Sequence, residues 1–263
     1  MDLCLKGKRA FVAGASQGLG YATALGLARE GAIVAINARG IENLNKAAQS
    51  IHQETGLDVY PAPGDVADPN LTRTILERAV ERLGSLDILI TNSGGPASGP
   101  FEIFSDEAWM SAVQTNFLSH VRLIRAALPE LRRSASASVL TITSYSAKQP
   151  IPNLVLSNSV RAATLGLTKT LALELGLEGI RFNSILPGVT DTARMGDLLE
   201  ARAHNNQTTV EEELQKQVQE IPLRRMASPE EFANAAVFLV SPAASYINGV
   251  MLQVDGGIIK SIY

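Results

Sequence analysis

The segment Ala13-Gly14-Ala15-Ser16-Gln17-Gly18-Leu19-Gly20 follows the apolar run Ala10-Phe11-Val12 and precedes the helix-like stretch 21–28. This order predicts a strand, a tight glycine turn and a helix. Glycine permits positive φ and close backbone approach, and the helix N-terminus offers unpaired N–H groups to an anion. The segment therefore predicts a pocket for the diphosphate of a nucleotide. Its G-x-x-x-G-x-G spacing differs from the commoner G-x-G-x-x-G.

Length and composition narrow the class of protein. The chain has 263 residues, 46% of them hydrophobic, which is enough for one large α/β domain with a substantial core. Its net charge of −3 and the lack of a basic stripe give no reason to expect nucleic acid as a partner. No apolar run approaches the roughly 20 residues of a membrane span, and we expect neither a signal peptide nor a membrane anchor. Cys4 is the only cysteine, which favours a reducing, cytoplasmic location.

Apolar runs alternate with helical patterns along the whole chain. The runs predict strands at 9–13, 32–38, 57–62, 86–91, 137–143, 180–186 and 250–254. The patterns between them predict helices at 18–30, 41–55, 68–83, 105–132, 154–177 and 228–240. This alternation is typical of an α/β fold with a doubly wound parallel sheet and right-handed crossovers. We find no linker or repeat, so residues 1–263 are expected to form a single domain.

Residues 193–227 interrupt this alternation with a more polar composition. Thr209 is followed three residues later by Glu212, which is typical of a capping box. We expect a helical insertion over the substrate side of the sheet. It is either a lid or a solvated helix pair without a mobile role. Ser228 and Pro229 then begin another helix, with a cap residue followed by proline at its first position.

Polar or glycine-rich clusters follow each of the first six predicted strands. Ligands of open parallel sheets bind beyond the carboxyl ends of the strands, so these clusters should meet at one edge. The six clusters are Gly14–Gly20, 38–39, 64–66, 91–95, 143–146 and 187–192. Their number indicates a binding site rather than six ordinary turns.

Arg39 bears on which nucleotide binds. An acidic residue after the second strand would accept hydrogen bonds from a ribose 2′-hydroxyl, but Ile36-Asn37-Ala38-Arg39 occupies that place. A guanidinium forms charge-assisted bonds with a 2′-phosphate, which an acid would repel. The sequence therefore favours NADP(H), with NAD(H) as the alternative.

The chain resembles the short-chain dehydrogenase/reductase family over nearly its whole length, and most closely its 3-oxoacyl-carrier-protein reductase-like members. The matches are the glycines of the first turn, Gly64-Asp65-Val66, Asn92-Ser93-Gly94, Asn116, Ser144, Pro187-Gly188 with Thr192, and Gly249 with Asp255-Gly256-Gly257. The resemblance implies a seven-stranded Rossmann sheet, a homotetramer built on the two long helices, and hydride exchange between a nicotinamide and a carbonyl or secondary alcohol. A small molecule is then the expected substrate.

The resemblance also assigns catalytic positions. In the family a serine binds the substrate oxygen, a tyrosine thirteen residues later moves the proton, a lysine one turn beyond binds the nicotinamide ribose, and an asparagine supports solvent. Ser144 and Asn116 match the serine and the asparagine. Ser157 and Arg161 stand where the tyrosine and lysine belong. The spacing keeps both on one helix face, but serine is a poorer acid than tyrosine and arginine does not readily exchange protons.

Three interpretations follow from this replacement. In the first, the protein is an active reductase with another proton route, through Tyr145 beside Lys148 or through Ser157 with Arg161. In the second, it binds NADP(H) but transfers hydride weakly or not at all, and serves as a sensor or partner subunit. In the third, the substrate supplies its own acid.

The candidate site residues fall into two sets, and no His or Cys spacing predicts a metal site. The expected catalytic set is Asn116, Ser144, Ser157 and Arg161. The expected cofactor-binding set is Gly14, Ser16, Gln17, Gly18, Leu19, Gly20, Arg39, Asp65, Val66, Asn92, Ser93, Gly94, Arg161, Pro187, Gly188, Val189 and Thr192.

Overall fold

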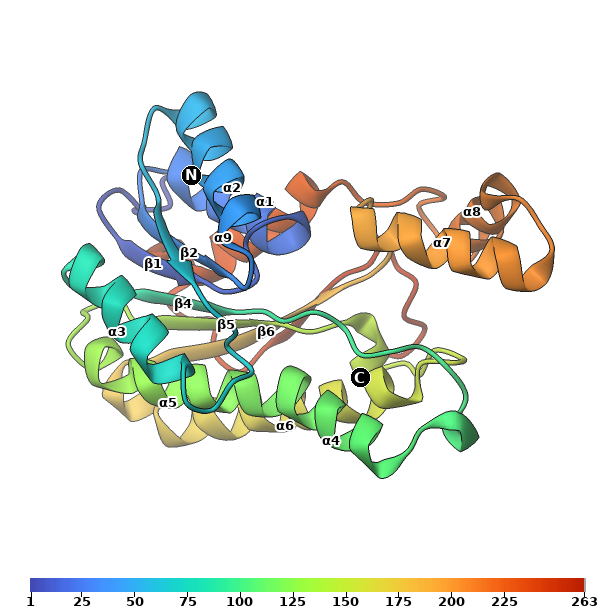
Figure 1. Ribbon diagram of the computed structural model, residues 1–263. Coiled ribbons are helices and arrows are strands. Elements are labelled where there is room, and N and C mark those ends of the chain that lie inside the picture. Colours follow the sequence, from blue (N-terminus) through green and yellow to red (C-terminus); the bar gives the residue numbers. More distant parts are fainter. Residues whose placement is uncertain (263) are drawn as a thin grey trace.

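A seven-stranded parallel sheet forms the centre of the computed structural model, which describes residues 1–262 (Figure 1). Its strand order is β3-β2-β1-β4-β5-β6-β7, and every neighbouring pair is parallel. The strands are β1 (Arg9–Val12), β2 (Ile33–Ala38), β3 (Tyr60–Pro63), β4 (Ile88–Thr91), β5 (Ser138–Ile142), β6 (Arg181–Pro187) and β7 (Met251–Val254). The predicted doubly wound Rossmann sheet is confirmed.

The central strands are buried on both faces, which explains their continuous apolar runs. All residues of β4 and β5 are buried. The predicted strand 57–62 is wrong at its start, since β3 begins only at Tyr60. This edge strand pairs with β2 alone, so its two prolines do not break a hydrogen-bond ladder on a second side.

Helices cover both faces of the sheet and enclose two apolar cores (Figure 1). One core lies under α1 (Gly18–Arg29), α2 (Ile41–Thr55) and α9 (Pro229–Val240). The other lies under α3 (Thr72–Leu83), α5 (Ser119–Leu131) and α6 (Val155–Glu174). This arrangement leaves the carboxyl edge of the sheet free for loops and polar side chains.

The polar segment after β6 forms the expected helical insertion. It contains α7 (Ala193–Asn206) and α8 (Val210–Gln219), which stand apart from the helices that flank the sheet (Figure 1). The predicted capping box is confirmed, because Thr209 Oγ1 accepts a bond from Glu212 N at 3.2 Å and the Glu212 carboxylate accepts one from Thr209 N at 2.8 Å. Ser228 and Glu231 repeat this box at the start of α9, with Pro229 at the first helical position.

The predicted helix 105–132 is not one regular helix. α4 (Asp106–Val113) passes into a π-helical turn, Gln114–Leu118, before α5 begins at Ser119. Thr164 of α6 donates to the carbonyl oxygen of Asn116 within this turn, at 3.1 Å. A π turn inserts an extra residue into a helix and is frequent at functional sites. Here it places Asn116, which is 1% exposed, beneath the carboxyl edge of the sheet.

Two other predicted helices are shorter than expected. The helix predicted at 68–83 begins at Thr72, because Asp68 uses its carboxylate and carbonyl oxygens to cap the preceding turn. The helix predicted at 154–177 ends at Glu174, and a 3₁₀ turn, Gly176–Glu178, follows it.

His120 is a buried histidine at the start of α5. It is 1% exposed, and its Nδ1 has no hydrogen-bond partner among the described residues. Burial, assisted by the positive charge of Arg161, lowers the pKa of His120 to about 3. The imidazole is therefore neutral in the folded protein.

His120 should make the protein sensitive to mild acid. Between the folded pKa and the ordinary value of 6.5, the unfolded chain binds a proton that the folded chain does not. The free energy of unfolding should therefore fall by about 2 kcal/mol from pH 7 to pH 5, above the range where carboxylates titrate. Urea unfolding at pH 7 and pH 5 measures this change, and the free energy of unfolding should fall less in His120→Leu than in the natural protein. His204→Gln, a control at an exposed position, should show the same fall as the natural protein. An equal fall in all three proteins would contradict the prediction.

Candidate active site

A groove runs along the carboxyl edge of the sheet and consists of two adjoining cavities. The first cavity, of about 310 Å³, lies between the ends of β5 and β6 and the helix α7. The second cavity, of about 680 Å³, lies at the ends of β2 and β3. The two cavities share the lining residues Gly14, Gln17, Asn92, Ser93, Gly94, Gly95 and Pro96. The six polar clusters expected from the sequence thus meet at one groove.

The glycine turn forms the floor where the two cavities meet. Gly14 and Gly18 both have φ of +61°, a conformation that favours glycine. A Cβ on Gly14 would lie 2.7 Å from the Asn92 Nδ2, and a Cβ on Gly20 would overlap the Gly14 carbonyl oxygen. No side chain caps the N-terminus of α1. The turn therefore leaves open backbone and helix N–H groups for a diphosphate.

Asn92 fixes this turn from the neighbouring strand. Its Nδ2 donates to the Gly14 carbonyl oxygen at 3.2 Å, which ties the end of β4 to the turn after β1. The next residue, Ser93, donates to the side-chain oxygen of Asn116 at 3.4 Å. A chain of polar contacts thus joins the glycine turn to the π turn.

The second cavity has the features expected for the adenosine half of a dinucleotide. Asn37, which is buried, donates to the carbonyl oxygens of Ala62 and Gly64 at 2.8 and 3.0 Å and so fixes the turn that presents Asp65. Arg39 lines the cavity, is exposed, and forms no ion pair within residues 1–262. Its guanidinium is therefore available to an anion.

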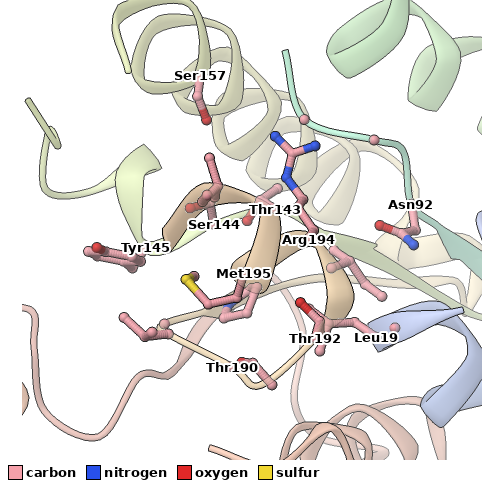
Figure 2. Close-up of a pocket in the computed structure, with 18 of the residues that line it drawn as sticks. Leu19, Asn92, Thr143, Ser144, Tyr145, Ser157, Thr190, Thr192, Arg194 and Met195 are labelled. Atoms are coloured by element: carbon pink, nitrogen blue, oxygen red, sulfur yellow. The ribbon is translucent and has the colours of Figure 1, made fainter. Parts of the chain in front are cut away.

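Ser144 and Ser157 lie at the other end of the groove (Figure 2), with Ser146 next to both. Ser144 begins the 3₁₀ turn Tyr145–Ala147, where its Oγ accepts a bond from Ser146 N at 3.1 Å. The hydroxyls of Ser146 and Ser157 lie 3.2 Å apart. Figure 2 shows Ser157 projecting from α6 toward Ser144. Ser144 and Ser157 both line the first cavity.

Arg161 lies one helical turn beyond Ser157, as the sequence predicts. The side chain is 8% exposed, and its Nη1 donates to the Thr143 carbonyl oxygen at 2.7 Å. Burial, with a smaller contribution from the charge of Arg194, lowers the pKa of Arg161 to about 10. Arg161 still carries its charge at neutral pH, so it acts as a fixed cation at the cavity wall.

Tyr145 is poorly placed to replace the missing tyrosine. Figure 2 shows its ring directed away from Ser157, and it packs against the small apolar cluster of Val189, Ile221, Ile258 and Ile259. Burial raises the pKa of Tyr145, and the charge of Arg202 only partly opposes this effect. Both observations favour the route through Ser157 and Arg161 over the route through Tyr145 and Lys148.

All but one of the sequence-predicted site residues line one of the two cavities. The exception, Gly20, packs against Gly14 and shapes the turn from behind. The sequence did not single out several other lining residues, namely Asn37, Asn43, Arg194, Met195, Leu198, Arg202 and Gln217. Five of these come from α7 and α8, where only the polar composition of 193–227 signalled a role.

Among residues 1–262, no group of three or more His, Cys, Asp or Glu side chains is placed to hold a metal ion. No helix in this range combines the length and apolarity that a bilayer span requires.

The groove therefore has the parts of a dinucleotide-dependent redox site. The glycine turn and Arg39 can hold the phosphates, while two serine hydroxyls and one buried cation line the first cavity. Hydroxyl donors and a fixed positive charge can stabilise negative charge that develops on a substrate oxygen.

Comparisons with known proteins agree with this description. Residues 14–259 match the family model described as Enoyl-(Acyl carrier protein) reductase. The chain is 32% identical to 7alpha-hydroxysteroid dehydrogenase of Escherichia coli K12, over 99% of this chain and 98% of that protein.

Two solved structures are also similar. L-sorbose reductase from Gluconobacter frateurii, complexed with NADPH and L-sorbose, has a TM-score of 0.95 and 33% identity, with 100% of both chains covered. An NADPH-bound short-chain oxidoreductase from Pseudomonas aeruginosa PAO1, described as containing an atypical catalytic center, has a TM-score of 0.85 and 32% identity, with 97% of both chains covered. The fold, the groove and these matches together show that the chain belongs to the short-chain dehydrogenase/reductase family of oxidoreductases.

Proposed function

We propose that the protein is an NADP(H)-dependent oxidoreductase that transfers hydride between the nicotinamide and a carbonyl or secondary alcohol. One observation carries the proposal: a single groove joins the glycine turn to the hydroxyls of Ser144 and Ser157 beside the Arg161 cation. Two similar structures bind NADPH, which supports the same cofactor here. The free guanidinium of Arg39 suits a 2′-phosphate.

The bound cofactor supplies or accepts the hydride, and the chain manages the charge and the proton at the substrate oxygen. Ser144 Oγ donates a hydrogen bond that orients this oxygen. As the oxygen becomes negative during reduction, the nearby Arg161 cation stabilises it. Ser157 gives its proton to the oxygen and takes one back from solvent water that enters the cavity it lines, while the Ser146 hydroxyl, 3.2 Å away, hydrogen-bonds to Ser157. The neutral His120 adds no second positive charge beneath Arg161.

A second candidate function follows from the same two residues. Ser157 and Arg161 occupy the positions of the family's tyrosine and lysine, and an alkyl hydroxyl is a weaker acid than a phenol. The alternative is a protein that binds NADP(H) with weak or no turnover and acts as a sensor or partner subunit.

Three finer features belong to the proposal. The resemblance to 3-oxoacyl-carrier-protein reductases supports 3-oxoacyl thioesters as one substrate class. It also supports a homotetramer built on α5 and α6, and Leu173 on α6 is a large apolar side chain that is 72% exposed in the single chain. Cys4, the only cysteine, suits the reducing conditions of the cytoplasm.

Turnover with NADPH tests the two candidate functions. The natural protein should oxidise NADPH in the presence of at least one member of a panel of ketones, acyl thioesters and ketoses, followed by absorbance. Ser144→Ala should lower kcat about a hundredfold, since a donor to the developing oxyanion is lost. NADPH binding without turnover of any class would favour the sensor, and no binding of NADPH or NADH would reject both functions.

Arg39 should set the choice of cofactor. Arg39→Gln should raise the Kd of NADPH about tenfold or more and leave the Kd of NADH nearly unchanged, because only NADPH carries the 2′-phosphate. Fluorescence titration measures both constants. Arg78→Gln, an exposed arginine on α3, is the matched control and should change neither. Equal weakening of both cofactors by Arg39→Gln would contradict the assignment.

Restoring the family pair should accelerate the reaction. Ser157→Tyr combined with Arg161→Lys should raise kcat about tenfold or more, since a phenol beside an ammonium is a better acid at neutral pH. Steady-state kinetics at saturating NADPH measures the gain, and thermal unfolding checks that the variant folds without the bond from Arg161 to Thr143. Unchanged or lower kcat in a folded variant that binds NADPH would mean that the natural serine and arginine already form the working proton route.

A further inference from the structure

The first cavity has an unbalanced charge. Three arginines line it, namely Arg161, Arg194 and Arg202, while no aspartate or glutamate is among its lining residues. Many exposed arginines of this chain behave differently, since Arg29, Arg73, Arg132 and Arg225 all pair with glutamates. The positive charge of this cavity is therefore not neutralised by its own wall.

Within residues 1–262, the hydrogen bonds of the three guanidiniums go to neutral groups. Arg161 donates to the Thr143 carbonyl oxygen at 2.7 Å. Arg194 donates weakly to the Pro96 carbonyl oxygen at 3.5 Å. Arg202 donates from Nη1 to the Gln217 side-chain oxygen at 2.5 Å. Most N–H groups of Arg194 and Arg202 thus remain available to a ligand.

The arginines of the groove lie in different places, some near the expected cofactor and others near the expected substrate. Arg39 and the glycine turn serve the phosphates of the cofactor, and Arg161 lies beside the reacting oxygen. Arg194 and Arg202 lie on α7 and line only the first cavity. Their eight-residue separation spans about 12 Å along the helix axis. Figure 2 shows Arg194 reaching inward between Ser157 and Asn92.

The part of the cavity around Arg202 has the features of a binding site. Gln217 of α8 is 8% exposed, and its amide oxygen accepts a hydrogen bond from the Arg202 guanidinium. Glu220 and Asp255 are close enough to influence Tyr145, but neither lines the cavity. The remaining wall is largely apolar, with Ile151, Leu154, Met195 and Leu198. A guanidinium fixed in this way is preorganised for two parallel bonds to a planar or tetrahedral anion.

Resting on the proposed function, we infer that the substrate is a carbonyl compound with an anionic group, a carboxylate or a phosphate, which Arg202 and Arg194 bind at the α7 wall. The apolar side chains contact the carbon chain between this group and the carbonyl. The anion balances the cavity charge and holds the carbonyl oxygen near Ser144 and Ser157. Neutral ketones lack this contact and leave the guanidiniums without a counter-charge.

Matched pairs of substrates test the inference with NADPH and the natural protein. Pyruvate and levulinate are compared with their methyl esters, and dihydroxyacetone phosphate with dihydroxyacetone. The anionic member of at least one pair should have a kcat/KM about tenfold or more above its neutral partner. A preference for the acids over their methyl esters would identify the bound group as a carboxylate. A preference for dihydroxyacetone phosphate over dihydroxyacetone would identify it as a phosphate. Equal use of the neutral members would overturn the inference while leaving the proposed function intact.

Variants locate the contact. Arg202→Gln should lower the anionic-to-neutral preference about tenfold, through KM rather than kcat, and should change the Kd of NADPH by less than twofold. Arg78→Gln should retain the preference. A preference that survives in Arg202→Gln, or a large loss of NADPH affinity in that variant, would overturn the assignment.

Binding decides the question if no compound is turned over. Calorimetry of the NADPH complex with levulinate and with dihydroxyacetone phosphate should then detect at least one anion, about tenfold more weakly in Arg202→Gln. In that case the anion site stands, and the proposed function is decided separately by the wider panel of ketones, acyl thioesters and ketoses. No measurable binding of either anion would overturn the inference.

Discussion

The close contact between Gly20 and the Gly14 carbonyl is the constraint on which the rest of the site depends. Any side chain at Gly20 would overlap that carbonyl oxygen, so only glycine lets α1 start directly behind the turn. Asn92 then reaches across from β4 to bind the same oxygen at 3.2 Å. This contact fixes the relative positions of the first and fourth strand ends, and Ser93 extends the link to Asn116. The glycine turn and the π turn that holds Asn116 are therefore connected through the end of β4.

The replacement of a tyrosine–lysine pair by Ser157 and Arg161 keeps the charge of the site but changes its proton chemistry. Arg161 remains charged although buried, because its pKa of about 10 is still well above neutrality. A guanidinium with several donors can bind the Thr143 carbonyl oxygen and still face the cavity, which favours a structural as well as an electrostatic role. At the position of the family's phenol the chain carries the Ser157 hydroxyl, whose neighbour at 3.2 Å is the Ser146 hydroxyl.

The sequence predicted the sheet and most of the groove because the signals for both are local. Alternating apolar runs fix the strands, and glycine spacing fixes the first turn. The π turn at 114–118 was not predicted, since the extra residue depends on the long-range bond from Thr164 to the Asn116 carbonyl. Arg194 and Arg202 were also missed. Their segment reads as an ordinary polar helix, and only the folded chain places them on the cavity wall opposite β5.

The placement of α7 and α8 outside the layers of the sheet has an evolutionary consequence. The two helices contribute to one wall of the first cavity, whereas the glycine turn belongs to the sheet edge and α1. No residue of 193–227 belongs to either of the two apolar cores. Sequence changes in this insertion would therefore reshape that wall while the sheet, both cores and the glycine turn are retained.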